Sequence, residues 1–213
     1  MIVLGSAYWP NLHYMHYWLA HNNVVLDTCE YFEKQTYRNR SVILSANGPL
    51  ALSIPVKKWQ EQTPVSAIEI SYKEPWQKQH WKALVSAYKN SPYFDFLEEE
   101  LQVFYETEYR YLLEFNMAQL HWLKKAYRLN ALPVIASEYI EPHQLKETDI
   151  DLRQRIHPKH EEILPEVRAI LSKPYYQTFS NKFEFVPNLS VLDLIFNEGI
   201  KTAAYLIGDA HLK

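Results

Sequence analysis

Apolar residues form two short runs near the start of the chain, with a helical pattern between them. Residues 2–4 and 24–26 are uninterrupted apolar triplets, and residues 12–20 form an aromatic-rich stretch after the break at Pro10. Short apolar runs on either side of a helix are typical of a strand–helix–strand unit with parallel strands. The pattern therefore predicts a compact βαβ unit at the start of the chain.

A second pattern predicts a β-hairpin. Two runs with strand composition, residues 42–46 and 50–56, lie on either side of Asn47-Gly48, the dipeptide most typical of a two-residue hairpin turn. In the second run, larger apolar residues alternate with other residues, which indicates one buried face. A two-residue turn would pair Ile43 with Leu52.

From Pro75 onward the apolar spacing becomes helical. Pro75 suits a first helical position, and apolar residues then recur at intervals of three and four until Pro92 ends the run. The same spacing predicts a second helix from Phe94 to Tyr105 and a third over residues 109–129. Two short runs with strand composition flank these helices: residues 67–71 and 134–136.

The last third of the chain has a different composition. Residues 141–187 contain five prolines, many charges and little periodicity, so we expect an ordered, loop-rich excursion. Residues 188–213 include Ser190 and, three positions later, Asp193, a pattern close to a capping box at a helix N-terminus. We expect this C-terminal helical segment to pack on the rest of the chain.

Together these patterns predict an α/β fold in a single domain over residues 1–213. The N-terminal βαβ unit and the β-hairpin would lie in a mixed sheet, covered by a helical layer and followed by the loop-rich C-terminal segment. With 213 residues, 47% of them hydrophobic, the chain is long enough to bury one sizeable core.

Composition narrows the classes of function. The formal net charge is only -3, which argues against a protein that coats nucleic acid, and four glycines argue against Gly-rich nucleotide loops. One cysteine cannot form an intrachain disulfide, which favours a reducing compartment. The start of the chain lacks a signal-peptide pattern, and no stretch approaches the ~20 apolar residues of a membrane span. We therefore predict a cytoplasmic protein without membrane insertion.

The segment Tyr37-Arg38-Asn39-Arg40 is a candidate anion site. On a regular strand, Arg38 and Arg40 would point to the same face, opposite the face that carries Leu52. Two guanidinium groups beside an amide can bind a phosphate or carboxylate in a bidentate manner. The alternative is a pair of solvated arginines on an edge strand.

Asp27 is a candidate acid or base. It directly follows the second apolar triplet, and in parallel α/β sheets ligands gather at the carboxyl ends of the strands. Together with Glu30 it could act as a general base or ligate a metal. It could equally cap a turn, the commoner role of an aspartate after a strand.

His13 and His16 form a second candidate pair. Their setting is similar to the His-x-Gly-His element of nucleotidylyltransferases, in which two imidazoles at a helix start contact phosphates, although Met15 stands where that element has its glycine. A His-x-x-His pair could also bind a metal, but no third ligand has a fixed spacing. We expect both rings to be half-buried among aromatic residues, and we predict no metal site.

Four other polar residues complete the candidate set. His157, with Arg153 shortly before it, lies in a charged loop that would suit a lid or a solvated turn. His80 and Asn116 lie on or beside apolar helix faces. Such residues usually satisfy polar partners within a core, but a pocket between helices would use the same groups.

These residues resemble a known family, the WbqC-like proteins of bacteria. The similarity runs nearly from end to end, and its tail is similar to the Bacteroidetes-type branch. Gly5-Ser6 stand where the family usually has Gln-Pro, and Asn11 and His13 replace a Trp and a Gly. The similar blocks are Tyr8-Trp9-Pro10-Asn11-Leu12-His13-Tyr14, Leu26-Asp27, Glu30-Tyr31-Phe32, Arg38-Asn39-Arg40, His80-Trp81, Ser91-Pro92-Tyr93-Phe94 and Pro174-Tyr175-Tyr176-Gln177.

The resemblance implies a link with bacterial surface-polysaccharide (O-antigen) biosynthesis. We therefore predict a cytoplasmic transferase that acts on an activated sugar or an acyl or aminoacyl donor, with a small anionic substrate and no identified cofactor. The alternatives are a nucleotidylyltransferase-like enzyme and a non-catalytic binding or assembly protein. The predicted catalytic residues are Asp27, His80 and His157, and the predicted ligand-binding residues are Tyr37, Arg38, Asn39, Arg40, Asn116 and Arg153.

Overall fold

A four-stranded parallel sheet organises the N-terminal part of the molecule. The computed structural model describes residues 1–129, 131–159, 162–200 and 202–207. The sheet order is β5-β2-β1-β6, and each neighbouring pair is parallel. The strands are β1 (Ile2–Leu4), β2 (Val24–Leu26), β5 (Val134–Ile135) and β6 (Ile150–Asp151).

The predicted βαβ unit is confirmed. Helix α1 (Leu12–Ala20) connects β1 to β2, and seven of its nine residues are buried. The side chain of Asn11 caps the helix by accepting a hydrogen bond from the backbone N–H of Tyr14, at 3.0 Å. The expected return of the chain to the sheet near residue 134 is also confirmed, because Val25 and Leu26 pair with Val134 and Ile135.

The predicted hairpin is present, but its register differs from the prediction. Strands β3 (Arg40–Ser45) and β4 (Gly48–Ser53) pair so that Ile43 lies opposite Leu50 rather than Leu52. Gly48 has a φ of 100° and already pairs with Ser45, so the turn lies over Ala46-Asn47. A positive φ confined to the glycine after the turn is typical of a hairpin loop closed by a bulge, which shifts the pairing. The hairpin forms a two-stranded sheet of its own.

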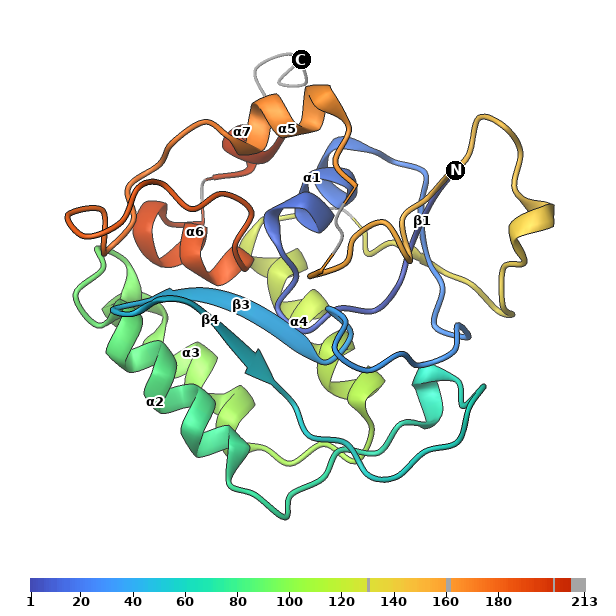
Figure 1. Cartoon of the computed structure of the whole chain (residues 1–213), viewed down its shortest axis with the longest axis horizontal. Helices are drawn as coiled ribbons and strands as arrows, with labels where there is room; N and C mark the ends of the chain where they lie inside the picture. Colours follow the sequence, from blue (N-terminus) through green and yellow to red (C-terminus); the bar gives the residue numbers. More distant parts are fainter. Residues whose placement is uncertain (130, 160–161, 201, 208–213) are drawn as a thin grey trace.

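Three helices form the predicted helical layer: α2 (Trp76–Tyr88), α3 (Phe94–Glu106) and α4 (Leu112–Ala126). The strand predicted at residues 67–71 is wrong. The first residue of that segment, Ala67, ends a 3-10 turn, η1 (Val65–Ala67). The described residues after it form only isolated bridges, from Glu69 and Ile70. In Figure 1 the hairpin crosses the molecule between α6 and α2, with α4 behind it. Strand β3 contacts both α2 and α6.

The C-terminal segment packs into the core through one apolar helix. The apolar side chains of α6 (Val191–Glu198) are fully or almost fully buried, and backbone hydrogen bonds tie its start to Val42 and Pro10. The preceding residues 141–187 contain η2 (Pro142–Gln144) and α5 (Pro165–Leu171), and the C-terminal segment also contains α7 (Ala203–Ile207). The α/β class predicted from the sequence is thus confirmed.

Ser190 caps α6 as expected, but Asp193 does not complete a capping box. The backbone N–H of Leu192 donates to Ser190 Oγ at 3.3 Å. Asp193 points into the core, where its carboxylate accepts hydrogen bonds from Tyr88 at 2.7 Å and Tyr175 at 2.6 Å. Burial raises the pKa of the Asp193 carboxyl. Its tertiary partners therefore replace the local backbone partner that the sequence pattern suggested.

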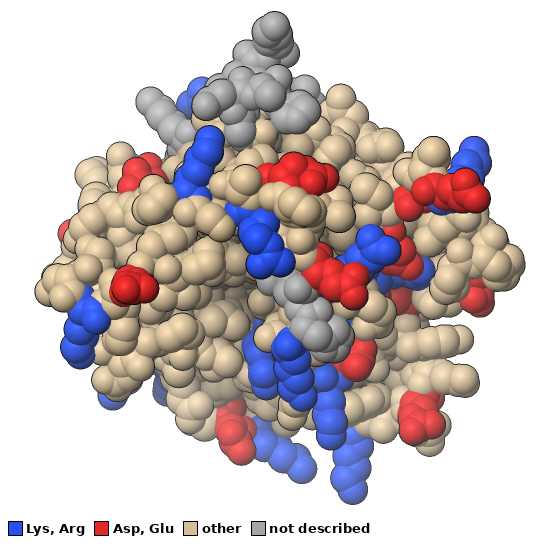
Figure 2. Space-filling view, turned by 45° about the horizontal axis from the view of Figure 1, so that its top comes forward, with Lys and Arg blue, Asp and Glu red and all other residues tan. Residues whose placement is uncertain are grey.

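Two surface observations bear on the predicted partners. Among the residues that the structure describes, no helix combines the length and apolar character that crossing a bilayer requires. On the face shown in Figure 2, acidic and basic side chains are interspersed. That face therefore lacks the one-signed basic surface typical of proteins that coat nucleic acid.

Candidate functional site

The carboxyl ends of two parallel strands, β1 and β6, meet at a small cavity. The chain runs from β1 to β2 and out to β5, then returns to place β6 on the other side of β1. The crevice between β1 and β6 is therefore the topological switch point of the sheet, where open α/β sheets bind ligands. A cavity of about 20 Å³ lies there, lined by Leu4 to Ala7 after β1 and by Leu152, Arg153 and Ile156 after β6. Tyr14, Tyr37 and Arg38 complete its wall.

Asp27 and Arg153 form a buried ion pair at this edge. Asp27, directly after β2, is completely buried, and its Oδ2 accepts a hydrogen bond from Arg153 Nη1 at 2.6 Å. The backbone N–H of Cys29 donates to Asp27 Oδ1 at 2.9 Å, and the backbone N–H of Ile140 donates to Oδ2 at 3.1 Å. Arg153 also binds Asp151 through Nε at 2.9 Å and Nη2 at 2.6 Å. All three nitrogens of this guanidinium group therefore have carboxylate partners.

Glu30 and Arg38 form a second buried pair beside the first. Each is 3% exposed, and the contact is bidentate, with Nε–Oε1 at 2.8 Å and Nη2–Oε2 at 2.5 Å. Arg38 Nη2 also donates to the carbonyl of Arg153 at 3.2 Å, which connects the two pairs. Gly5 makes room for this arrangement, because a Cβ atom there would lie 2.3 Å from Glu30 Oε1.

The charges of this edge cluster (Asp27, Glu30, Arg38, Asp151 and Arg153) do not balance. Three carboxylates face two guanidinium groups, so the cluster carries a net charge of -1 when all five groups are ionised. Burial raises the pKa of the Glu30 carboxyl, while the neighbouring Arg38 acts in the opposite direction. Because burial is the larger effect, the pKa of the Glu30 carboxyl lies above its ordinary value.

The prediction that Arg38 and Arg40 share one strand face is wrong. Arg38 lies in the turn before β3 and points into the buried cluster. Arg40, the first residue of β3, is only partly buried, and its Nε donates to Ser53 Oγ at 3.1 Å. The chain is not a regular strand at residues 37–39, so the alternation that would align the two side chains does not apply there.

Three other predicted binding residues, Asn116, Tyr37 and Asn39, form hydrogen bonds that hold the backbone next to the edge cluster and the hairpin. Asn116 on α4 is completely buried and donates through Nδ2 to the carbonyl of Arg38 at 2.8 Å and to Ser6 Oγ at 3.2 Å. Tyr37 lines the cavity, and its carbonyl accepts the backbone N–H of Tyr8 at 2.9 Å. Asn39 donates to the carbonyl of Ile54, which holds the hairpin in place.

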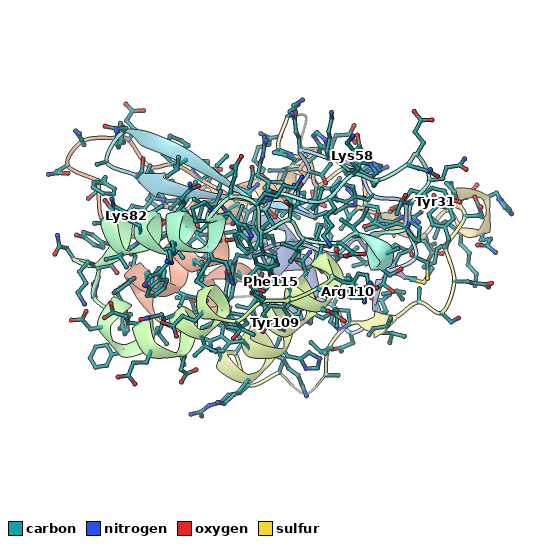
Figure 3. The ribbon with its side chains drawn as sticks, turned by 90° about the horizontal axis from the view of Figure 1, so that it is seen from below. Tyr31, Lys58, Lys82, Tyr109, Arg110 and Phe115 are labelled. Carbon is teal, nitrogen blue, oxygen red and sulfur yellow. The ribbon has the colours of Figure 1, made fainter. Side chains whose placement is uncertain are left out.

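His80 lies outside the edge cluster. Its Nδ1 is 2.9 Å from the hydroxyl of Tyr8, which is itself 3.1 Å from the hydroxyl of Tyr105. The imidazole ring packs against Trp76 on α2. Figure 3 shows that α2 lies away from the edge cluster: Lys82, on the same helix as His80, and Tyr31, which follows Glu30 of the cluster, lie toward opposite ends of the molecule. The structure therefore places His80 in the aromatic core between α2 and the hairpin.

Burial makes His80 a source of acid sensitivity. Desolvation lowers its pKa from 6.5 to about 4, a change that corresponds to about 3 kcal/mol. Between these values the unfolded chain binds a proton that the folded chain does not, so stability is present above pH 6.5 and lost as the pH falls toward 4. We expect urea unfolding at pH 7 and pH 5 to show a smaller loss in His80→Gln than in the unaltered chain. Equal losses in both proteins would contradict this assignment.

The other three candidate histidines, His13, His16 and His157, make structural contacts within the fold. His157 is buried, and its Nδ1 accepts the backbone N–H of Lys159 at 3.1 Å, directly after the cavity-lining residue Ile156. His13 and His16 are buried in α1, where both rings pack against Tyr17, and His16 Nδ1 lies 2.6 Å from the carbonyl of Leu206. Among the described residues, no group of three or more metal-ligating side chains converges.

Several residues of the site carry no signal that the sequence patterns could detect. Tyr139 stacks on Tyr31 and lies 5.0 Å from the Arg153 guanidinium group, so aromatic rings cover the outer side of the edge cluster. Tyr14 and Ser6 line the cavity but resemble ordinary core residues in the sequence. Glu30 was recognisable only as a companion of Asp27.

Comparison with known protein families identifies the family of this chain. The model of the WbqC-like protein family matches residues 6–177. The chain belongs to the WbqC-like protein family. The match to the WbqC-like model includes Ser6, all five residues of the edge cluster and Asn116, and it ends before α6. A comparison with curated proteins found no match, and a comparison with solved structures found none either.

Proposed function

We propose that this WbqC-like protein is a transferase that binds an activated donor at the switch point between β1 and β6. The observation that carries the proposal is that two arginines of the edge cluster, Arg38 and Arg153, line a cavity at the carboxyl ends of the parallel strands β1 and β6. Family membership supports a role in surface-polysaccharide biosynthesis, with an activated sugar or an acyl or aminoacyl group as the donor.

The contacts suggest distinct roles for the charged residues. Arg38 is the binding residue, because its hydrogen bonds use Nε and Nη2 and leave Nη1 without a partner among the described residues. Asp27 is a positioning residue, since both of its oxygens are occupied by Arg153 and backbone N–H groups. Glu30 is the acid–base candidate, because its pKa is raised and it lies against the cavity wall at Gly5.

Binding of a donor should depend on Arg38. We expect titration calorimetry with a panel of UDP-glucose, acetyl-CoA and an aminoacyl-adenylate analogue to identify at least one ligand. For that ligand, Arg38→Lys should weaken binding at least tenfold, or about 1.4 kcal/mol, because lysine cannot reproduce the planar fork. Arg110→Lys is the matched control, since Arg110 is exposed and does not line the cavity.

Three outcomes separate the hypotheses. Turnover of the bound donor that is lost in Glu30→Gln would support a transferase, whereas binding without turnover would favour a non-catalytic binding protein. Equal affinities of Arg38→Lys and the unaltered chain would place the donor elsewhere on the molecule and would contradict the proposed site. Each variant is compared at a temperature at which circular dichroism shows that it is folded.

A further inference from the structure

Tyr14 lines the cavity, and its buried hydroxyl group forms no hydrogen bond with any described residue. Tyr14 lies on α1 and is 3% exposed, and its hydroxyl has no hydrogen-bond partner among the described residues. Leaving such a donor unsatisfied in a buried position is unfavourable. Burial raises the pKa of this hydroxyl, and the nearby Glu30 carboxylate raises it further, so the group keeps its proton and can donate it.

Two more donors line the same cavity. Ser6 Oγ accepts a hydrogen bond from Asn116 Nδ2, which leaves the Ser6 hydroxyl proton to donate. Arg38 contributes Nη1, the nitrogen that donates to no described residue. A group that enters the cavity therefore meets three donors, and an oxygen that only accepts hydrogen bonds fits them best.

Charge and size restrict that oxygen further. The edge cluster behind the cavity has three carboxylates and two guanidinium groups, so a second anion would add to a net charge of -1. The volume of about 20 Å³ has room for one water-sized group, not for a phosphoryl group with its three oxygens. A sugar hydroxyl is small enough, but its own proton would need an acceptor, and none of the described residues that line the cavity carries a carboxylate.

We propose that the cavity formed by Tyr14, Ser6 and Arg38 receives the neutral carbonyl oxygen of an acyl group. This inference rests on the proposed function and selects the acyl or aminoacyl donor over the activated sugar. The acyl oxygen enters between the three donors, and the rest of the donor lies outside, toward the aromatic pair Tyr31 and Tyr139.

A matched pair of small probes tests this inference directly. Acetamide and acetate have the same shape, but acetamide presents a neutral carbonyl oxygen and acetate an anion. We expect acetamide to shift the Nε–Hε resonance of Arg38 in the ¹H–¹⁵N spectrum, and acetate to bind at least tenfold more weakly. In Tyr14→Phe the acetamide affinity should fall at least tenfold while the melting temperature is retained or raised, because the lost hydroxyl forms no hydrogen bond with a described residue in the free protein.

Tyr17→Phe is the matched control, because Tyr17 lies on the same helix and its buried hydroxyl also has no hydrogen-bond partner in the described part of the chain, but Tyr17 does not line the cavity. Stronger binding of acetate than of acetamide would overturn the carbonyl assignment and leave an anion site. The assignment would also fall if neither probe bound while UDP-glucose still bound in an Arg38-dependent manner, and the proposed function would then stand. Failure of both probes and of every donor in the panel would reject both.

Discussion

Replacing Glu30 with alanine is expected to lower the free energy of unfolding by about 3–5 kcal/mol, because it leaves the Arg38 guanidinium group buried without its bidentate partner. Arg38 is 3% exposed, so water cannot replace the lost carboxylate without local opening of the cluster. Urea unfolding followed by circular dichroism measures the effect. A loss below about 1 kcal/mol would show that the pair is not isolated from solvent.

The chain offers a matched control for this measurement. Glu69 forms an ion pair with Lys57 at 2.6 Å, but both side chains are at least partly exposed, so Glu69→Ala should cost less than about 1 kcal/mol. A second variant separates stability from binding. Glu30→Leu combined with Arg38→Met replaces both charges with apolar groups, which should recover much of the stability lost in Glu30→Ala, while the loss of Arg38 abolishes donor binding.

A chain that ends at Pro187 should not fold. We propose that residues 1–213 form one domain. In it, residues 141–187 are the loop-rich excursion and residues 188–213 are the C-terminal helical segment. Residues 201 and 208–213 of that segment lie outside the part of the chain that the structure describes. The apolar side chains of α6 are buried, and each contributes ~1.5–3 kcal/mol by burial. Their sum is comparable with the ~5–15 kcal/mol stability of a whole domain. We expect aggregated or unfolded protein by gel filtration and circular dichroism.

Single substitutions test the same packing without removing a segment. Phe196 is completely buried, and its ring centroid lies 4.9 Å from that of Tyr88 and 5.0 Å from that of Phe94. Phe196→Ala should therefore lower the free energy of unfolding by about 3–5 kcal/mol. Phe96 is 79% exposed, and Phe96→Ala should leave the stability within about 0.5 kcal/mol of the unaltered chain. A soluble 1–187 fragment with an unchanged melting temperature would show that the C-terminal segment is an appendage.

The elements that the sequence predicts well are those with a local cause. Helix α1 and the three helices of the layer follow from apolar spacing, a capping asparagine before α1 and prolines at their boundaries, all of which act within a few residues. The predicted hairpin register is wrong because the register depends on the conformation of a single residue, Gly48, and not on composition.

The candidate site was harder to predict because its geometry comes from long-range contacts. Asp27 was expected at a carboxyl end, and it lies there, but its partner Arg153 is 126 positions away in the chain. Arg38 faces Glu30 because the backbone before β3 turns inward, which the alternation rule could not anticipate. Asp193 illustrates the same limit, since the partners that draw it inward come from residues 88 and 175.

Hydrogen–deuterium exchange, with and without a donor from the panel that binds, tests the location of the site most directly. The proposed site predicts slower exchange in three segments that are distant in sequence but meet at the switch point: residues 4–8, 36–39 and 152–156. Exchange in α2 and α3 should not change. Protection confined to α2 and α3, with the three segments unaffected, would contradict donor binding at the carboxyl edge of the sheet.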